Sequence, residues 1–226
     1  GGGDRAVTPL DRERLGMVEN GSRVSIVVEN AHASISQFRT LVAAVRDNIY
    51  LRDILARRKI ELLNLQQGKV FERSGRVVYV EPPALVLLGP IQLGDYSHDG
   101  VDHALTVTLK RAVGVDLTLK GDERTNGLVV LSGMATLDCQ LFEHENQTGT
   151  EYLFGTVRCP ALIAQLGKGE AIISDDRDGL NHKHPFVAAF THAVSAMIAP
   201  HVLAEQEKHR HLERASTSER TSPRPM

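Results

Sequence analysis

The sequence predicts an α+β protein in which mixed or antiparallel sheets of short strands are combined with an early helical hairpin and a long C-terminal helix. Three observations predict this class. Apolar residues recur at helical spacing between residues 35 and 55, short runs of alternating or β-branched residues fill most of residues 60 to 157, and helical spacing returns after Pro185. The 226 residues can bury one core, or one core with a smaller subdomain.

The N-terminal half is expected to pass from a strand to a helix and back to strands. A β-branched run at 23–29 predicts a strand, and Phe38, Leu41 and Val45 belong to a helical stripe that continues or restarts through Leu55. From residue 60 the apolar period becomes two, as in a half-buried strand. Short strands are therefore expected at 59–65, 69–71, 76–80, 84–88 and 104–109, with a loop at 94–100.

The C-terminal half is expected to hold the remaining strands and two helices. Proline is favoured in the first helical turn, so Pro160 and Pro185 each predict a helix start. Pro200 should kink the second helix or restart it, because it removes a helical hydrogen bond. The predicted strands are 127–131, 134–137 and 152–157, and 113–119 could form another.

The expected organisation has four parts. They are a flexible lead-in at 1–20, a transducer-like α+β domain at 21–120, a second α+β subdomain with the C-terminal helix at 121–214, and a disordered tail at 215–226.

Composition argues against several classes of protein. The net charge of −2 and the 4% aromatic content give no general attraction for nucleic acid and a poor base-stacking platform. No apolar run approaches 18 residues, so neither a membrane span nor a membrane partner is expected. The expected location is the cytoplasm. Cys139 and Cys159 are too few for a disulfide framework. They are expected to be reduced and buried, although one bridge between them is possible.

Established phosphate-binding motifs are missing. A Walker site needs GxxxxGK[ST], and a Bergerat-type site needs an activating carboxylate, a magnesium-holding Asn and a glycine-rich lid; neither pattern is present. The nearest approach to a phosphate-facing lysine is Lys69 in the segment Gln66-Gln67-Gly68-Lys69. An ordinary hairpin lysine is the alternative interpretation.

An acidic loop lies before the C-terminal helix. Asp175, Asp176 and Asp178 could chelate a divalent cation, but counting an EF-hand loop from Ser174 puts a proline where a glutamate is needed. A turn in which Gly179 supplies a positive φ, with Asp side chains capping backbone amides, is the simpler interpretation.

A group of histidines follows this loop. His182 and His184, together with His192 and His201, could bind zinc, but their spacing matches no established ligand pattern. Capping of the helix start is enough to explain His184, which precedes a proline.

The early helical hairpin carries a basic run. Its members are Arg39, Arg46, Arg52, Arg57, Arg58 and Lys59, offset by Asp47 and Asp53. This local excess of positive charge could contact the phosphates of a nucleic acid, and a solvated helix face is the alternative.

Five segments in order resemble one family: 21–28 (GSRVSIVV), 48–55 (NIYLRDIL), 127–142, 154–160 (FGTVRCP) and 176–186 (DRDGLNHKHPF). Together they resemble the region that follows the ATP-binding domain in long bacterial and archaeal GHKL-type ATPases, the relatives of histidine-kinase, gyrase B, MutL and heat-shock-chaperone ATPases. The first segment is similar to the closing strand of the nucleotide domain. The last is the most distinctive, and its motif residues are Asp176, Arg177, Asp178, Gly179, Asn181 and His184.

The resemblance implies a non-catalytic, transducer-like module that couples the nucleotide state of an ATPase to dimerisation or partner binding. ATP and magnesium would belong to the parent protein, with no cofactor in this chain. The partner would be its own ATPase domain or an ATPase subunit, in a homodimer, with the helix from Pro185 to about Arg214 as the docking surface. Lys69 is the residue that the resemblance implies as a contact to nucleotide phosphate.

Two alternatives from other classes stay open. One is a nucleic-acid-binding module that uses the basic hairpin from Arg39 to Lys59. The other is a metal-dependent hydrolase built on Asp175, Asp176, Asp178, His182 and His184.

Overall fold

The computed structural model describes residues 8–15, 37–64, 72–115, 117, 125–133, 135–176 and 179–221. The chain divides into a short N-terminal unit, residues 1–37, and a larger unit, residues 38–226. In the first unit, helix α1 spans Pro9–Leu15 and is capped by the Thr8 hydroxyl, which accepts a hydrogen bond from the Asp11 amide at 3.2 Å. The strands predicted at 23–29 and 69–71, and Lys69, lie outside the described residues.

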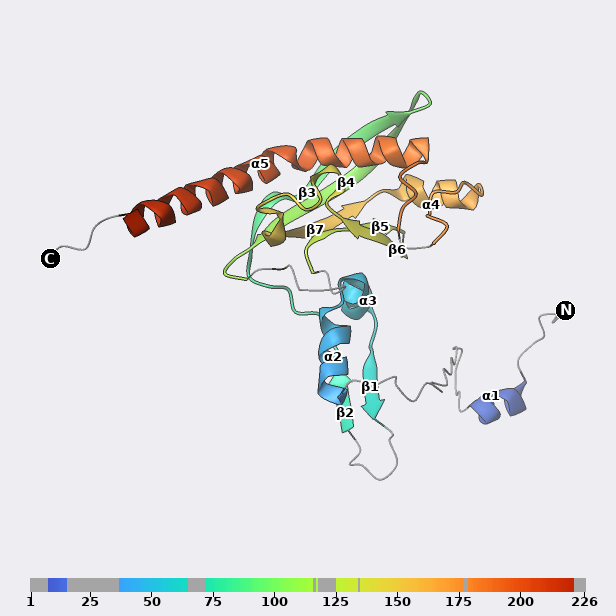
Figure 1. Cartoon of the computed structure of the whole chain (residues 1–226). Helices are drawn as coiled ribbons and strands as arrows, with labels where there is room; N and C mark the ends of the chain where they lie inside the picture. Colours follow the sequence, from blue (N-terminus) through green and yellow to red (C-terminus); the bar gives the residue numbers. More distant parts are fainter. Residues whose placement is uncertain are drawn as a thin grey trace. The chain divides into compact units, whose positions relative to one another are not determined.

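The larger unit is α+β, as predicted. A two-stranded antiparallel sheet pairs β1 with β2, and a mixed sheet has the strand order β3-β4-β7-β5-β6 (Figure 1). All pairs in the second sheet are antiparallel except β5–β7. The strands are β1 Glu61–Asn64, β2 Glu72–Arg76, β3 Ala84–His98, β4 Val101–Ala112, β5 Gly127–Ser132, β6 Ala135–Gln140 and β7 Leu153–Arg158. The domain division expected at residue 120 falls inside this sheet, because β3 and β4 precede it and the other three strands follow it.

The helices of this unit lie at the positions that the periodicity and the prolines predict. They are α2 Phe38–Asp47, α3 Arg52–Arg57, α4 Pro160–Gly167 and α5 Pro185–Thr221, with 3-10 turns η1 Ile49–Leu51, η2 Phe142–His144 and η3 Thr150–Tyr152. The Asn48 side chain caps η1 by accepting hydrogen bonds from the amides of Tyr50 and Leu51 at 3.0 and 3.3 Å. The early helical segment and the two helix starts at proline are therefore confirmed.

Helix α5 differs from its prediction at two points. It runs through Pro200 without restarting, because buried Ile198 and Val202 hold it to the core on both sides of the proline. It also continues to Thr221, past the end expected near Arg214. The sequence offers no residue that stops a helix before Pro223.

The β3–β4 pair corrects two strand predictions. These strands form one long hairpin of 15 and 12 residues, so the description "short strands" does not fit them. The loop predicted at 94–100 is wrong, because β3 continues to His98 and only Asp99 and Gly100 turn. Their φ angles of 49° and 74° are both positive, as in a type I′ hairpin turn. Gly94 lies in the strand, where an added Cβ would be 2.6 Å from the sulfur of Met197.

Two other strand predictions are also corrected. Residues 77–80 are not a strand, since β2 ends at Arg76, although the Val77 amide still donates to the Ile60 carbonyl at 2.8 Å. Residues 113–115, which begin the strand considered at 113–119, have no strand structure.

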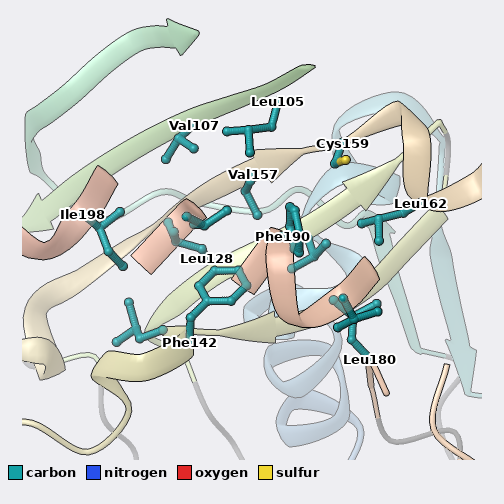
Figure 2. Close-up of a cluster of buried hydrophobic side chains, with 14 of the residues drawn as sticks. Leu105, Val107, Leu128, Phe142, Val157, Cys159, Leu162, Leu180, Phe190 and Ile198 are labelled. Atoms are coloured by element: carbon teal, nitrogen blue, oxygen red, sulfur yellow. The ribbon is translucent and has the colours of Figure 1, made fainter. Parts of the chain in front are cut away.

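The main hydrophobic core lies between the mixed sheet and α5. Figure 2 shows this cluster, in which Leu105, Leu128 and Val157 from the sheet meet Phe190 and Ile198 from α5. All five side chains are buried. The apolar stripe of α5 therefore faces the sheet, as expected for an amphipathic helix.

The opposite face of β5 is covered by a second, smaller hydrophobic cluster. Val129 and Leu131 form a second cluster with Cys139 of β6 and with Ile49 of η1. Every residue of β5 is buried as a result, which explains why its sequence is a continuous apolar run instead of an alternating one. Cys139 and Cys159 are both buried and are not joined by a disulfide, as predicted.

Part of α5, within Pro185–Ala215, is long and apolar enough to cross a membrane by length and composition alone, with a mean hydropathy of 1.5 over 18 residues. Alanines between the large apolar residues raise the hydropathy of this stretch, although polar residues such as Thr191 and Ser195 interrupt it. A core helix passes the same test, and its large apolar residues pack against the sheet.

A buried ion pair fastens α5 to β4. Glu205 is 3% exposed and accepts hydrogen bonds from Arg111 Nε and Lys208 Nζ, each at 2.5 Å. Burial by itself favours the neutral acid, but the two cations together outweigh burial and hold the pKa of Glu205 below its usual value. The pair should therefore stabilise the fold at neutral pH.

We expect Glu205→Gln to lower the free energy of unfolding by about 2 kcal/mol at pH 7, because Arg111 and Lys208 lose a charged acceptor. Since the folded-state pKa is depressed, this stabilisation is complete above the unfolded-state pKa and is lost as the pH falls through the folded-state value. Urea unfolding at pH 7 and at about pH 3 should show the gap between wild type and variant closing in acid.

The matched control is Glu207→Gln, which removes an exposed carboxylate two residues away on the same helix. It should change the free energy of unfolding by no more than about 0.5 kcal/mol. A Glu205→Gln gap that stayed constant with pH would contradict the ionic role of Glu205.

Candidate functional site

Residues 179–184, part of the most distinctive segment of the sequence, form the end of the loop that leads into α5. Ile173 and Leu180 pair as an antiparallel bridge, and the Asn181 amide donates to the Ile172 carbonyl at 2.8 Å. Gly179 has a φ of +153°, so the positive φ predicted for it is confirmed. Asp176 is exposed, whereas Arg177 and Asp178 lie outside the described residues. The loop is thus closed by backbone pairing at its base.

Asp138 on strand β6 anchors this loop to the sheet. Its side chain is buried, and its Oδ2 accepts hydrogen bonds from the Leu180 amide at 2.8 Å and from Gln140 Nε2 at 3.0 Å. Oδ1 accepts from the Cys139 amide at 2.6 Å. The loop passes so close that a Cβ on Gly179 would lie 2.6 Å from Asp138 Oδ2. A glycine is therefore required for this approach.

Two motif residues shape the start of α5. The Asn181 side chain donates to the Ala171 carbonyl at 2.8 Å and accepts from the Lys183 amide at 3.2 Å. His184 Nδ1 accepts from the Phe186 amide at 3.3 Å, which is the capping role expected for it. Because Nδ1 is an acceptor here, neutral His184 carries its proton on Nε2, 3.2 Å from a Glu170 carboxylate oxygen.

A pocket of about 510 Å³ lies where the tip of the β3–β4 hairpin, the end of α4 and the start of α5 meet. Its volume is within the range of small-molecule sites. The lining side chains are mainly polar, and three of them are histidines. The lining consists of His98, Asp99, Val101, His103, Gln165, Lys168, Glu170, His184, Pro185 and Phe186.

One wall of this pocket is an aromatic cluster built around Phe186, the second residue of α5. The rings of His98 and His103 lie 5.3 and 5.1 Å from the Phe186 ring in edge contacts, and Tyr96 lies 5.6 Å from it. Tyr96 also contacts Phe190 one turn further along. Such contacts contribute about 0.5–1.5 kcal/mol each beyond burial, so the cluster clamps the first turns of α5 to the hairpin.

Tyr96 joins this cluster to a buried cysteine. Its hydroxyl lies 3.6 Å from the sulfur of Cys159. Burial raises the pKa of the Tyr96 phenol, and it also raises the pKa of the Cys159 thiol. Both groups therefore stay neutral at physiological pH, and Cys159 is a core residue instead of an activated nucleophile.

The six basic residues of the early helical segment are largely engaged. Three pair with carboxylates: Arg46 with Asp47, Arg57 with Asp53, and Lys59 with Glu61. The guanidinium of Arg52 lies over the rings of Tyr79 at 4.7 Å and Phe154 at 5.5 Å. Only Arg39 and Arg58 are exposed without an ion pair among the described residues. The structure thus leaves little free positive charge for phosphates at this segment.

The described residues considered for metal binding do not come together, and Asp178 lies outside the described part of the chain. His182 is exposed, His192 lies 3.3 Å from Glu143, and His201 lines a different pocket, between β3 and α5. Within the described part of the chain, no group of three or more His, Cys, Asp or Glu side chains is arranged to hold a metal ion.

Sequence reasoning missed most of the pocket. His98 and His103 flank the Asp99-Gly100 turn, and Asp-Gly between β-type runs is a strong hairpin signal that the loop prediction for 94–100 overlooked. In that hairpin His103 pairs with Tyr96 across the strands. Asp138 carries no comparable local signal, because its partner Leu180 is 42 residues away along the chain.

Comparisons of this chain with models of protein families, with curated proteins and with solved structures find no match.

Proposed function

We propose that this chain is a non-catalytic, transducer-like module of a GHKL-type ATPase, which couples the nucleotide state of that enzyme to dimerisation or to binding of a partner. The observation that carries the proposal is helix α5. The helix starts at the polar pocket, and residues 179–184 of the segment resembling the family form the end of the loop that leads into it.

Helix α5 is suited to transmit a displacement. The helix presents a continuous buried face to the sheet through Phe190, Val194 and Ile198. This face runs from the aromatic cluster around Phe186 to the ion pair of Glu205 with Arg111. Close-packed helices move as units and not by local deformation. A shift of the loop that starts α5 would therefore appear at the far end of the helix.

The edge strand β3 offers a surface for the partner. Leu85, Val86, Ile91 and Leu93 are each more than half exposed, and β3 pairs only with β4 in the described sheet. Exposed apolar side chains in a group commonly mark protein contacts. In the proposed module this surface, together with α5, would contact an ATPase domain or subunit, or a second copy in a homodimer.

The proposal predicts that the chain has no ATPase activity of its own. Phosphate release from Mg-ATP should stay at the level of a buffer blank across a range of protein concentrations, because ATP and magnesium would be held by the parent enzyme. The control is a mock preparation from cells that do not express this chain, taken through the same purification, which reveals a contaminating ATPase. Turnover that scales with folded protein would refute a non-catalytic module.

A further inference from the structure

We propose that the pocket at the start of α5 binds a small oxyanion, a phosphate or carboxylate group, through Lys168, His103 and Gln165. These three side chains line the pocket, and none of them has a hydrogen bond or ion pair with another described residue. They come from two separate parts of the chain, strand β4 and the end of α4, and meet only in the fold. The site is independent of the proposed ATPase partnership.

The choice of an anion follows from which groups are already satisfied. Of the two carboxylates of the pocket, Glu170 lies within hydrogen-bond distance of His184 Nε2, at 3.2 Å, and Asp99 is 89% exposed to solvent, 3.4 Å from His98 Nε2. The groups left over are the Lys168 ammonium, which has only donors, the His103 imidazole and the Gln165 amide. The open capacity of the pocket is therefore weighted towards donors with one positive charge, which an oxygen-rich anion complements.

A further hydrogen-bond donor of the pocket becomes available when a carboxylate turns away. Glu170 is 50% exposed and Asp99 is 89% exposed, so either carboxylate can turn into solvent. The Nε2–H of His184 would then face an incoming oxyanion. The first turn of the 37-residue helix α5 forms part of the wall, and the positive end of its dipole favours negative charge there.

The test is a titration of the full chain, labelled with 15N in its histidines, with inorganic phosphate at constant ionic strength and pH. We expect saturable shifts of the imidazole signals of His98, His103 and His184, with those of exposed His182 unchanged.

Lys168→Met should weaken phosphate binding about tenfold, the effect of losing one charge-assisted hydrogen bond. Glu170→Gln should strengthen it, because it removes a competing negative charge.

The matched control is Lys183→Met, which removes an exposed lysine next to His184 that does not line the pocket. It should leave the affinity within about twofold of wild type.

Three results would overturn the proposal: equal weakening by both lysine variants, the absence of a saturable shift, or zinc binding at these imidazoles that excludes phosphate. A parallel titration with acetate distinguishes a general carboxylate site from one that prefers phosphate. Mg-ATP that displaced phosphate without being hydrolysed would support the site and leave the proposed function intact.

Discussion

Gly155→Ala should prevent this chain from reaching its native fold, or cost more than about 4 kcal/mol of the free energy of unfolding. Gly155 lies in β7, where it pairs with Leu109 of β4 on one side and Leu128 of β5 on the other. A Cβ at this position would overlap the carbonyl oxygen of Thr108 and lie 2.9 Å from a Leu128 methyl carbon. The carbonyl belongs to the backbone of a paired strand, so relief requires β4 and β7 to separate.

Soluble yield and urea unfolding of the Gly155→Ala variant measure this effect. Gly167→Ala is the matched control, because a Cβ at Gly167, the last residue of α4, meets no atom within 4 Å and its φ is not positive. Alanine is the better helix former by about 1 kcal/mol, so this control should be neutral or slightly stabilising. A Gly155→Ala variant as stable as wild type would mean that β7 does not lie between β4 and β5.

Asp138→Ala has the second-largest expected effect, a loss of about 3–5 kcal/mol. The substitution leaves the amides of Cys139 and Leu180 and the side-chain amide of Gln140 without their shared acceptor in a buried place. Asp138→Asn should fall between wild type and Asp138→Ala, since it keeps one acceptor oxygen. Urea unfolding measures the cost, and hydrogen exchange at Leu180 should report release of the loop.

Asp176→Ala is the control for the role of Asp138, because Asp176 belongs to the same loop but is exposed. It should change the free energy of unfolding by less than about 0.5 kcal/mol. If the two aspartate variants unfolded at the same urea concentration, the loop would not depend on Asp138. Exposed Asp176 would then contribute as much to the free energy of unfolding as buried Asp138.

Local signals were sufficient for much of the secondary structure. Pro160 and Pro185 marked helix starts because proline fits the first helical turn, and the continuous apolar run of β5 was recognisable as a strand. The errors came where local and tertiary information disagree. The loop was predicted from Gly94, but Gly94 lies in strand β3 opposite Leu105, and Met197 of α5 packs against it where a side chain would otherwise lie.

The candidate site was predictable only in part for a related reason. The loop that ends at His184 stood out because its Gly, Asn and His residues have local roles in turns and caps. The pocket did not, since His103 and Lys168 are far apart in the sequence and approach only when the hairpin and α4 pack beside α5. No local pattern of residues encodes that meeting.

The amino-acid sequence alone determined the α+β class and the start of most elements, because periodicity, proline and glycine act over a few residues. The insertion of β7 between β4 and β5, the anchoring of the loop by Asp138 and the assembly of the pocket were decided by the tertiary structure. These features depend on contacts between distant segments, and such contacts are selected by the packing of the whole core.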